Sequence, residues 1–289
     1  MATHVFLSPH LDDAVESCGG LMAKLRHNGE QVLVITCFQK QQNLDEIPRK
    51  MKVFADYKQR YEENGKALQM LDVKHRGLDF FERAFVQPYL TSLPAVFFAP
   101  PGGSSKYLDF HRLTESIKQI VNEDAGNNNF FYAPLGIGNH YDHTRLFFAA
   151  VKVMEETGRH SSFLFYEDAY SLMGNAIRKK HPIARECLYP KSADPSRLSP
   201  RTFITALVLN WSIDMKSIVP ELEEIARRYT WKVQHEDIGA FLDKKLAALF
   251  CYESQIRALM GGEKLTTKLL KKYHEFWNQA EPFWRAEKK

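Results

Sequence analysis

The chain has 289 residues, enough for one large domain, and its 44% hydrophobic and 26% charged content is that of a soluble globular protein. Its 39 lysines and arginines against 35 aspartates and glutamates give a net charge of +4 without a concentrated basic stripe, so we expect no nucleic-acid partner. The first predicted strand lies within a few residues of Met1 and no apolar run could span a bilayer, so we expect a cytoplasmic protein without a signal peptide or stable membrane anchoring.

The first part of the chain alternates between strand-like and helix-like patterns. Apolar runs at 5–8 and 31–38 predict two strands, and the Gly-punctuated stretch 14–27 between them predicts a helix. Such a βαβ unit implies parallel strands joined by a right-handed crossover. The same patterns then predict a long amphipathic helix over 51–71, a strand at 77–80, a helix at 111–121 and a strand at 130–134.

The remainder continues this alternation and becomes helical toward its end. Its predicted elements are a helix at 144–156, strands at 163–166 and 203–210, helices at 217–228 and 237–260, and a tail at 265–289 that is helical and then frays. The long segments 84–110 and 171–200 are expected to be functional loops. We therefore expect a single α/β domain over residues 1–289, with a mostly parallel sheet flanked by helices and a helical C-terminal region from about residue 215.

One histidine and two aspartates follow the first predicted strand directly. The run Ser8-Pro9-His10-Leu11-Asp12-Asp13 stands between that strand and the first helix. Ligands of open α/β sheets bind at the carboxyl ends of the strands. His10 and Asp13 can hold a divalent metal there, which leaves Asp12 as a carboxylate beside it. The alternative is that Asp13 only caps the following helix.

A second polar cluster, His140-Tyr141-Asp142-His143, follows the strand predicted at 130–134. His143 would complete a set of two imidazoles and one carboxylate with the first cluster. Zinc accepts such a set and keeps an open position for water, although ferrous iron accepts it as well. A His-x-x-His pattern by itself is equally consistent with the start of a helix, but both clusters come directly after strands, which favours a metal site.

The remaining residues of the two clusters suit acid–base work on an amide. Asp12 could lie beside the metal-bound water, the nucleophile, as its general base. His140 would reach the same cavity and stabilise the oxyanion or protonate the leaving nitrogen. Asp142 could orient a neighbouring imidazole. These patterns together indicate a metal-dependent hydrolase.

Both motifs resemble those of a known family. The run 8–15 with Cys18-Gly19-Gly20 is similar to the signature of the LmbE-like, or PIG-L, zinc-dependent de-N-acetylases, and Gly138 to His143 is similar to that family's second motif. The resemblance extends over nearly the whole chain through weaker matches, at Arg60 and Glu62, at Tyr166-Glu167-Asp168, and from Lys245 through 252–255. Departures from the family pattern are Leu11 and Tyr141, where proline is common, and Ala14, where glutamate is common.

The resemblance implies a Rossmann-like fold and zinc-dependent removal of an N-acyl group, usually acetyl from an amino sugar. It also implies metal ligands His10, Asp13 and His143, the base Asp12, and His140 at the tetrahedral intermediate. We therefore predict an N-deacetylase that uses Zn²⁺, or another divalent metal such as Fe²⁺, on an amino sugar or a sugar-containing small metabolite.

Substrate contacts are less determined by the sequence. Tyr141 adds a hydroxyl near the site, while Glu167 and Asp168 either bind sugar hydroxyls or cap the next turn. Glu16 is expected on a solvated helix face, with a position in the pocket as the alternative.

Other functions remain open at this point. One is an amide hydrolase of the thiol-conjugate amidase type that acts on a bulkier N-acyl group, and another is a non-catalytic metal-binding protein. A nucleotide-dependent transferase is disfavoured because Gly19-Gly20 is too sparse for a dinucleotide fingerprint. The expected partner is a small N-acylated substrate, and homo-oligomerisation stays open.

Overall fold

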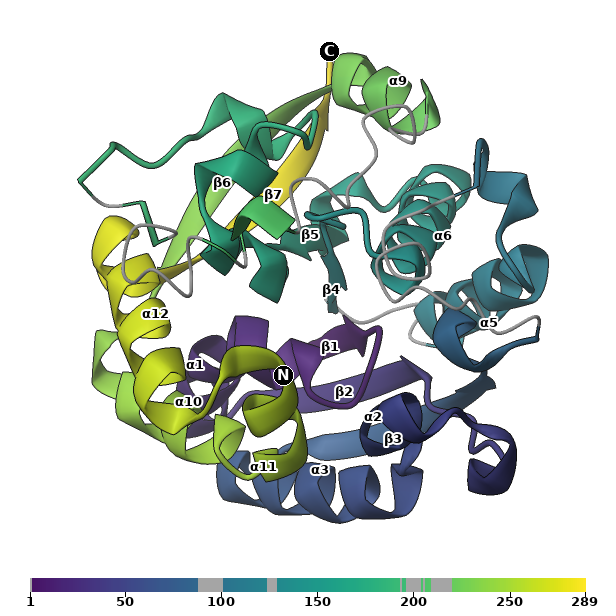
Figure 1. Cartoon of the computed structure of the whole chain (residues 1–289). Helices are drawn as coiled ribbons and strands as arrows, with labels where there is room; N and C mark the ends of the chain where they lie inside the picture. The colour runs from purple at the N-terminus through teal and green to yellow at the C-terminus, as the bar shows by residue number, and fades with distance from the viewer. Residues whose placement is uncertain are drawn as a thin grey trace.

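The computed structural model describes residues 2–87, 101–123, 129–192, 194–195, 204, 206–208 and 220–289. Within these residues the strands form one seven-stranded sheet in the order β3-β2-β1-β4-β5-β7-β6. Helices lie on both sides of it (Figure 1). One side carries α1 (Asp13–His27), α3 (Tyr57–Leu71) and α10 (Leu242–Leu249), and the other carries α5 (Phe110–Glu123) and α6 (Tyr141–Thr157). The predicted α/β class, a mostly parallel sheet flanked by helices, is confirmed.

Five neighbouring strands run parallel to one another. They are β3 (Lys74–Phe80), β2 (Gln31–Phe38), β1 (Thr3–Ser8), β4 (Phe130–Pro134) and β5 (Phe163–Tyr166). β1, β4 and β5 are buried almost throughout, which explains why their sequences are continuous apolar runs without alternation.

The order of these strands reverses at β1. From β1 the chain adds β2 and β3 on one side, and it then crosses to add β4 and β5 on the other side. Loops that leave β1 and β4 therefore diverge in opposite directions and open a crevice at the carboxyl ends of these two strands. Both polar clusters predicted from the sequence follow these two strands, so the topology brings them to one place.

The predicted helical C-terminal region is confirmed, but this part of the chain also contains two strands that were not predicted. β6 (Tyr229–Asp237) pairs antiparallel with β7 (Ala280–Lys288), and β7 lies between β6 and β5. The tail predicted to be helical and fraying thus ends in a buried inner strand. Pro282 lies within β7, and proline is disfavoured in inner strands because it cannot donate to the ladder, so the sequence signal for this strand is weak.

Several predicted helices have different limits. The helix predicted over 51–71 is divided into α2 (Lys52–Ala55) and α3, because Asp56 leaves helical geometry and caps α3 through the backbone N–H of Gln59. The helix predicted over 237–260 begins only at α10 and continues after a break as α11 (Glu253–Gln255). Other helices are α7 (Asn175–Arg178), α9 (Pro220–Arg228) and α12 (Glu263–Phe276).

Two further expectations concern segments that are described only in part. The strand expected at 203–210 is wrong where it can be checked, because residues 204 and 206–208 are helical. The functional loop predicted at 84–110 falls partly outside the described residues, which omit 88–100. Within the described ranges, no helix has the length and apolar character that a membrane span requires.

A buried ion pair joins β7 and α10 to the middle of α1. Glu281 accepts hydrogen bonds from the backbone N–H groups of Gly20 and Leu21 at 3.0 and 2.8 Å, and Lys245 Nζ lies 2.8 Å from Glu281 Oε1. A Cβ on Gly20 would lie 2.8 Å from the Cβ of Ile238, so the close approach of the α1 backbone to Ile238 requires glycine at this position. The helix that begins with the first polar cluster is thereby fixed to the C-terminal part of the chain.

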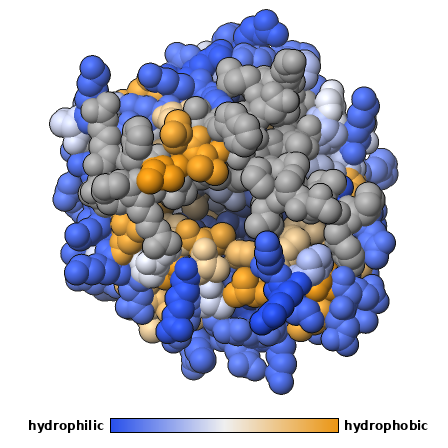
Figure 2. Space-filling model, in the orientation of Figure 1, coloured by the Kyte–Doolittle hydropathy of each residue, from blue (hydrophilic) through white to orange (hydrophobic). Residues whose placement is uncertain are grey.

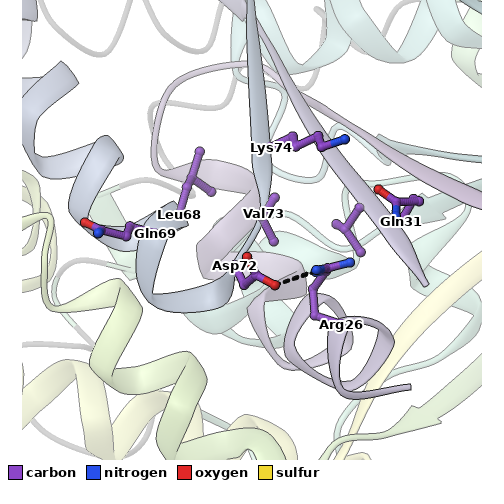
Figure 3. Close-up of a pocket in the computed structure, with 8 residues that line it drawn as sticks. Arg26, Gln31, Leu68, Gln69, Asp72, Val73 and Lys74 are labelled. Carbon is purple, nitrogen blue, oxygen red and sulfur yellow. Dashed lines mark hydrogen bonds and ion pairs between the residues drawn. The ribbon is translucent and has the colours of Figure 1, made fainter. Parts of the chain in front are cut away.

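One surface hollow lies at the opposite edge of the sheet, where β2 and β3 begin (Figure 3). It is lined by Arg26, Gln31, Val32, Leu68, Gln69, Asp72, Val73 and Lys74. The ion pair drawn in it joins Arg26 to the exposed Asp72. Because neither the crevice nor the histidine clusters lie at this edge, we do not assign it a catalytic role.

Candidate active site

The turn from β1 to α1 builds the first polar cluster. The Ser8 hydroxyl donates to the carbonyl oxygen of His10 at 2.5 Å and accepts from the backbone N–H of Ala14 at 3.0 Å. The backbone N–H of His10 donates to Asp13 Oδ2 at 2.8 Å. These bonds tie the strand end to the helix start, and they hold His10, Asp12 and Asp13 in buried positions at the sheet edge.

A glycine-rich turn after β4 builds the second cluster. Gly136 and Gly138 adopt φ values of 81° and 89°, and a Cβ on Gly138 would lie 2.7 Å from the Cβ of Tyr170. Only glycine fits this conformation and this contact. The turn places His140 at the N-cap of α6 and His143 in its first turn.

The two clusters meet in the crevice. His10 Nδ1 and His143 Nε2 lie 3.1 and 3.3 Å from the same oxygen, Asp13 Oδ2. The His140 ring centroid lies 5.2 Å from that of His10 and 4.8 Å from that of His143. These three imidazoles each offer a nitrogen within 4.8 Å of the others. The structure thus brings together the three predicted metal ligands and adds His140 to them.

Asp168 lies behind His143 and contacts its ring, a role that was not predicted for it. His143 Nδ1 lies 2.5 Å from Asp168 Oδ1, and Asp168 Oδ2 accepts from the backbone N–H groups of Gly136 and Ile137 at 2.7 and 2.8 Å. When Nδ1–H donates to a carboxylate, Nε2 keeps its lone pair for a cation. Asp168 therefore fixes both the backbone of the turn after β4 and the orientation of the His143 ring.

Carboxylates lie close to the imidazoles of His10 and His143. Burial opposes ionisation of Asp13, but His143 and His10 outweigh it and hold the pKa of Asp13 well below its usual range. Burial also opposes protonation of His143, but the Asp13 and Asp168 carboxylates raise the pKa of His143 to about 9. In the same way, Glu82 and Asp13 hold the pKa of His10 well above its usual value against burial. Such surroundings favour a bound cation.

Asp12 and His140, the residues predicted to act on the substrate, have opposite shifts. Burial and then the Asp13 carboxylate raise the pKa of Asp12, whose Oδ1 accepts from Arg60 Nη2 at 3.4 Å. Burial and then the charge on His143 lower the pKa of His140 well below its usual value. Asp12 is thus a stronger base than an ordinary aspartate, and His140 is neutral at neutral pH.

Arg60 and Glu82 form a buried ion pair beside Asp12 and His10. Arg60 Nη1 donates to Glu82 Oε1 at 2.8 Å, and the Tyr57 hydroxyl donates to the same oxygen. Glu82 Oε2 lies 3.8 Å from His10 Nε2. Arg60 was expected here only through the family resemblance, and Glu82 was not expected from the sequence. Glu82 follows β3 as the other clusters follow β1 and β4, so the same reasoning could have found it.

Asp142, predicted to orient an imidazole, makes only a long contact of that kind. Its Oδ2 lies 3.5 Å from His10 Nε2 and accepts from the backbone N–H of Arg83 at 3.0 Å. A distance of 3.5 Å is at the outer limit for a hydrogen bond. The contact of Asp168 with His143, at 2.5 Å, is much shorter, and Asp168 comes from the end of a different strand.

The predicted substrate contacts at Tyr141 and Glu167 have protein partners. The Tyr141 hydroxyl accepts from the backbone N–H of residue 108 at 2.9 Å. The buried Glu167 carboxylate accepts hydrogen bonds from Arg178, Tyr273 and Trp284. These contacts favour the structural alternative for Glu167, and a role of either residue in substrate binding stays a prediction.

Glu16 is buried, which corrects the preferred expectation of a solvated helix face. Its exposed fraction is 8%.

Figure 2 shows one face of the molecule as hydrophilic around its rim, with more hydrophobic residues gathered near its middle.

Comparison with known proteins places this site in a family. The family model of GlcNAc-PI de-N-acetylases, PIG-L, matches residues 5–154, which include both clusters and more than half of the chain. The chain belongs to the PIG-L family. The predicted family and the predicted class of enzyme, an N-deacetylase, are thereby confirmed. Among curated proteins, none matches the chain.

Solved structures similar to this PIG-L chain cover its whole length. The zinc-inhibited form of teicoplanin deacetylase Orf2 has 19% identity and a TM-score of 0.68, and 100% of this chain and 99% of that chain are covered. The A40926 pseudoaglycone deacetylase Dbv21 has 18% identity, 99% and 97% coverage and a TM-score of 0.61. N,N'-diacetylchitobiose deacetylase from Pyrococcus horikoshii has 14% identity, 99% and 84% coverage and a TM-score of 0.50. At these identities the likeness establishes the fold.

Proposed function

We propose that this PIG-L chain is a zinc-dependent hydrolase that removes an N-acetyl group from an amino sugar or a sugar-containing small metabolite. The observation that carries the proposal is the convergence of His10, Asp13 and His143, with Asp12 beside them, in the crevice between β1 and β4. Similar structures include deacetylases of teicoplanin and of N,N'-diacetylchitobiose, and this supports a sugar-bearing substrate.

The donor atoms in the crevice fit zinc. Two imidazole nitrogens and one carboxylate oxygen converge, and a second carboxylate lies behind His143 as in many zinc sites. In our proposal His10, Asp13 and His143 hold the metal, although Fe²⁺ suits the same donors. Zinc bound there supplies a Lewis acid that polarises the amide carbonyl and lowers the pKa of water.

The protein's own groups then move the proton and stabilise charge. Asp12 accepts a proton from the attacking water and passes it to the leaving nitrogen, so that acetate and a free amine are formed. Its raised pKa makes it a stronger base than an ordinary aspartate, and its Oδ1 accepts a hydrogen bond from Arg60. The neutral His140 ring donates one N–H to the oxygen on which negative charge develops.

Removal and return of the metal test this proposal directly. After treatment with a chelator, the protein should release no amine from N-acetylglucosamine, its glycosides or N,N'-diacetylchitobiose, and added zinc should restore equal amounts of amine and acetate. Both products are measured by chromatography. Amine release without acetate from substrates with larger acyl groups would instead support an amidase of the thiol-conjugate type, and failure to take up any metal would contradict the proposal.

Two variants decide which donor set is used. His10, His140 and His143 form a second possible set, because their nitrogens also lie close together. We favour Asp13 over His140, because one Asp13 oxygen approaches both other rings while the His140 ring stacks on Tyr170. We expect His140→Ala to retain one zinc per chain with reduced turnover, and Asp13→Ala to lose zinc, by metal analysis. The reverse pattern would assign the ligand position to His140.

A further inference from the structure

Glu16 is a buried carboxylate that the proposed mechanism does not use. Its exposed fraction is 8%, and its Oε1 has no hydrogen-bond partner among the described residues. Burying a polar group without a partner costs free energy, so such a group in a native structure calls for a reason. Glu63 shows the usual arrangement: it is equally buried, and its oxygens accept from Gln59 and from the backbone and hydroxyl of Ser254.

Glu16 lies on the side of α1 that faces the crevice. It comes three and four residues after Asp13 and Asp12, and this spacing puts the three side chains on one face of the helix. Burial and then the charges of Asp12 and Asp13 raise the pKa of Glu16 to about 8, and His143 also acts on it. The carboxyl group is therefore within electrostatic reach of both clusters.

An aromatic ring borders the same space. Tyr170 stacks on His140 with ring centroids 5.8 Å apart and meets His143 edge-on at 5.6 Å. Burial raises the pKa of the Tyr170 hydroxyl, and nearby carboxylates, Glu16 among them, act in the same direction. A carboxyl group and an aromatic ring beside one reaction centre are the two kinds of group that recognise a sugar, through its hydroxyls and through its apolar face.

The buried Lys245, whose positive charge acts on Glu16, makes its hydrogen bonds to other groups. Lys245 Nζ lies 2.8 Å from Glu281 and 3.2 Å from both the carbonyl oxygen of Ser17 and His274 Nε2. Glu16 is also not part of the group of three histidines that can share a metal. Its Oε1 is thus left without a partner among the described residues, on the face of α1 that also carries Asp12 and Asp13.

We propose that Glu16 is a specificity residue, which hydrogen-bonds a substrate hydroxyl close to the acylated nitrogen. The inference rests on the proposed function and deepens it, because it selects N-acylated amino sugars with a free hydroxyl near the amide over simple N-acyl amines. A carboxyl group accepts a hydrogen bond from a hydroxyl when ionised, and it can also donate one when protonated. The contact is therefore available in either state.

The test compares N-acetylglucosamine with its 3-deoxy, 4-deoxy and 6-deoxy analogues in the wild type, Glu16→Gln and Glu16→Leu. We expect the wild type to prefer the parent sugar over one analogue by roughly 10- to 100-fold in kcat/KM, as for a site that loses one buried hydrogen bond. Glu16→Leu should reduce kcat/KM for the parent by a similar factor and leave that analogue within about twofold of its wild-type value. Glu16→Gln should keep part of the preference, and all three proteins should bind equal zinc.

Thermal unfolding separates this role from a structural one. Because Glu16 Oε1 has no hydrogen-bond partner among the described residues, Glu16→Leu should leave Tm unchanged or raise it, whereas Glu63→Leu, the matched control, should lower Tm by several degrees. A fall in Tm for Glu16→Leu equal to that of the control, or unchanged discrimination between parent and analogues, would overturn the inference. A wild type that releases no amine from any of these sugars would refute the proposed function as well.

Discussion

Replacing Asp12 by asparagine is expected to lower kcat by a factor of about 10² to 10⁴, while the protein keeps its full content of zinc. Asparagine retains the shape of the side chain and an oxygen that Arg60 can reach, but it cannot accept the proton of the attacking water. Metal content should persist because Asp12 lies outside both possible donor sets. Steady-state kinetics and metal analysis on the same sample measure the two effects.

The control for this variant is Glu62→Gln, which removes a carboxylate from an exposed position on α3. It should leave both kcat and zinc content unchanged. Wild-type turnover in Asp12→Asn would remove Asp12 from the role of base. Loss of zinc in that variant would mean that Asp12 is itself a ligand.

The second large effect is expected from His143→Ala, which should abolish stoichiometric zinc binding and turnover together. His143 belongs to both possible donor sets and is the ring that a buried carboxylate orients, so its loss removes a donor whichever set is used. Asp168→Asn should show a graded form of the same defect, with zinc affinity lower by about 10- to 100-fold, because the ring stays but loses the negative charge of its partner. Competition against a chromogenic chelator measures both affinities.

His75→Ala serves as the matched control, because His75 contacts Thr36 and lies on β3 away from the crevice. It should bind zinc like the wild type. Unreduced zinc affinity in His143→Ala would be incompatible with the proposed ligand set. Equal affinity in Asp168→Asn and the wild type would show that the contact behind His143 only stabilises the turn.

The parallel half of the fold and the two histidine clusters could be predicted because each is local in the sequence. β1 and β4 are uninterrupted apolar runs, and the polar residues follow them without a gap. The carboxyl ends of parallel strands share one edge of the sheet. The direction of the strands was therefore enough to predict that His10 and His143 lie close together.

The features that the sequence did not reveal depend on distances that spacing does not determine. Asp142 stands next to His143 in the sequence, yet Asp168 makes the short contact with its ring, because the first residues after β5 lie beside the turn after β4. The burial of Glu16 depends on elements packed over α1 from the C-terminal part of the chain. β7 was missed because it contains a proline and is buried on both faces, so it lacks the alternation of a half-exposed strand.

The position of β7 also constrains the order in which the molecule can be assembled during synthesis. The strand made last is an inner one, so the edge of β5 lacks its neighbour until residues 280–288 have left the ribosome. Glu281 of that strand also holds the backbone of α1, the helix that carries Asp12 and Asp13 at its start. A nascent chain that already contains every proposed catalytic residue would therefore still expose an unpaired strand and a loosely held helix. We expect chaperone binding to be strongest during this interval of synthesis.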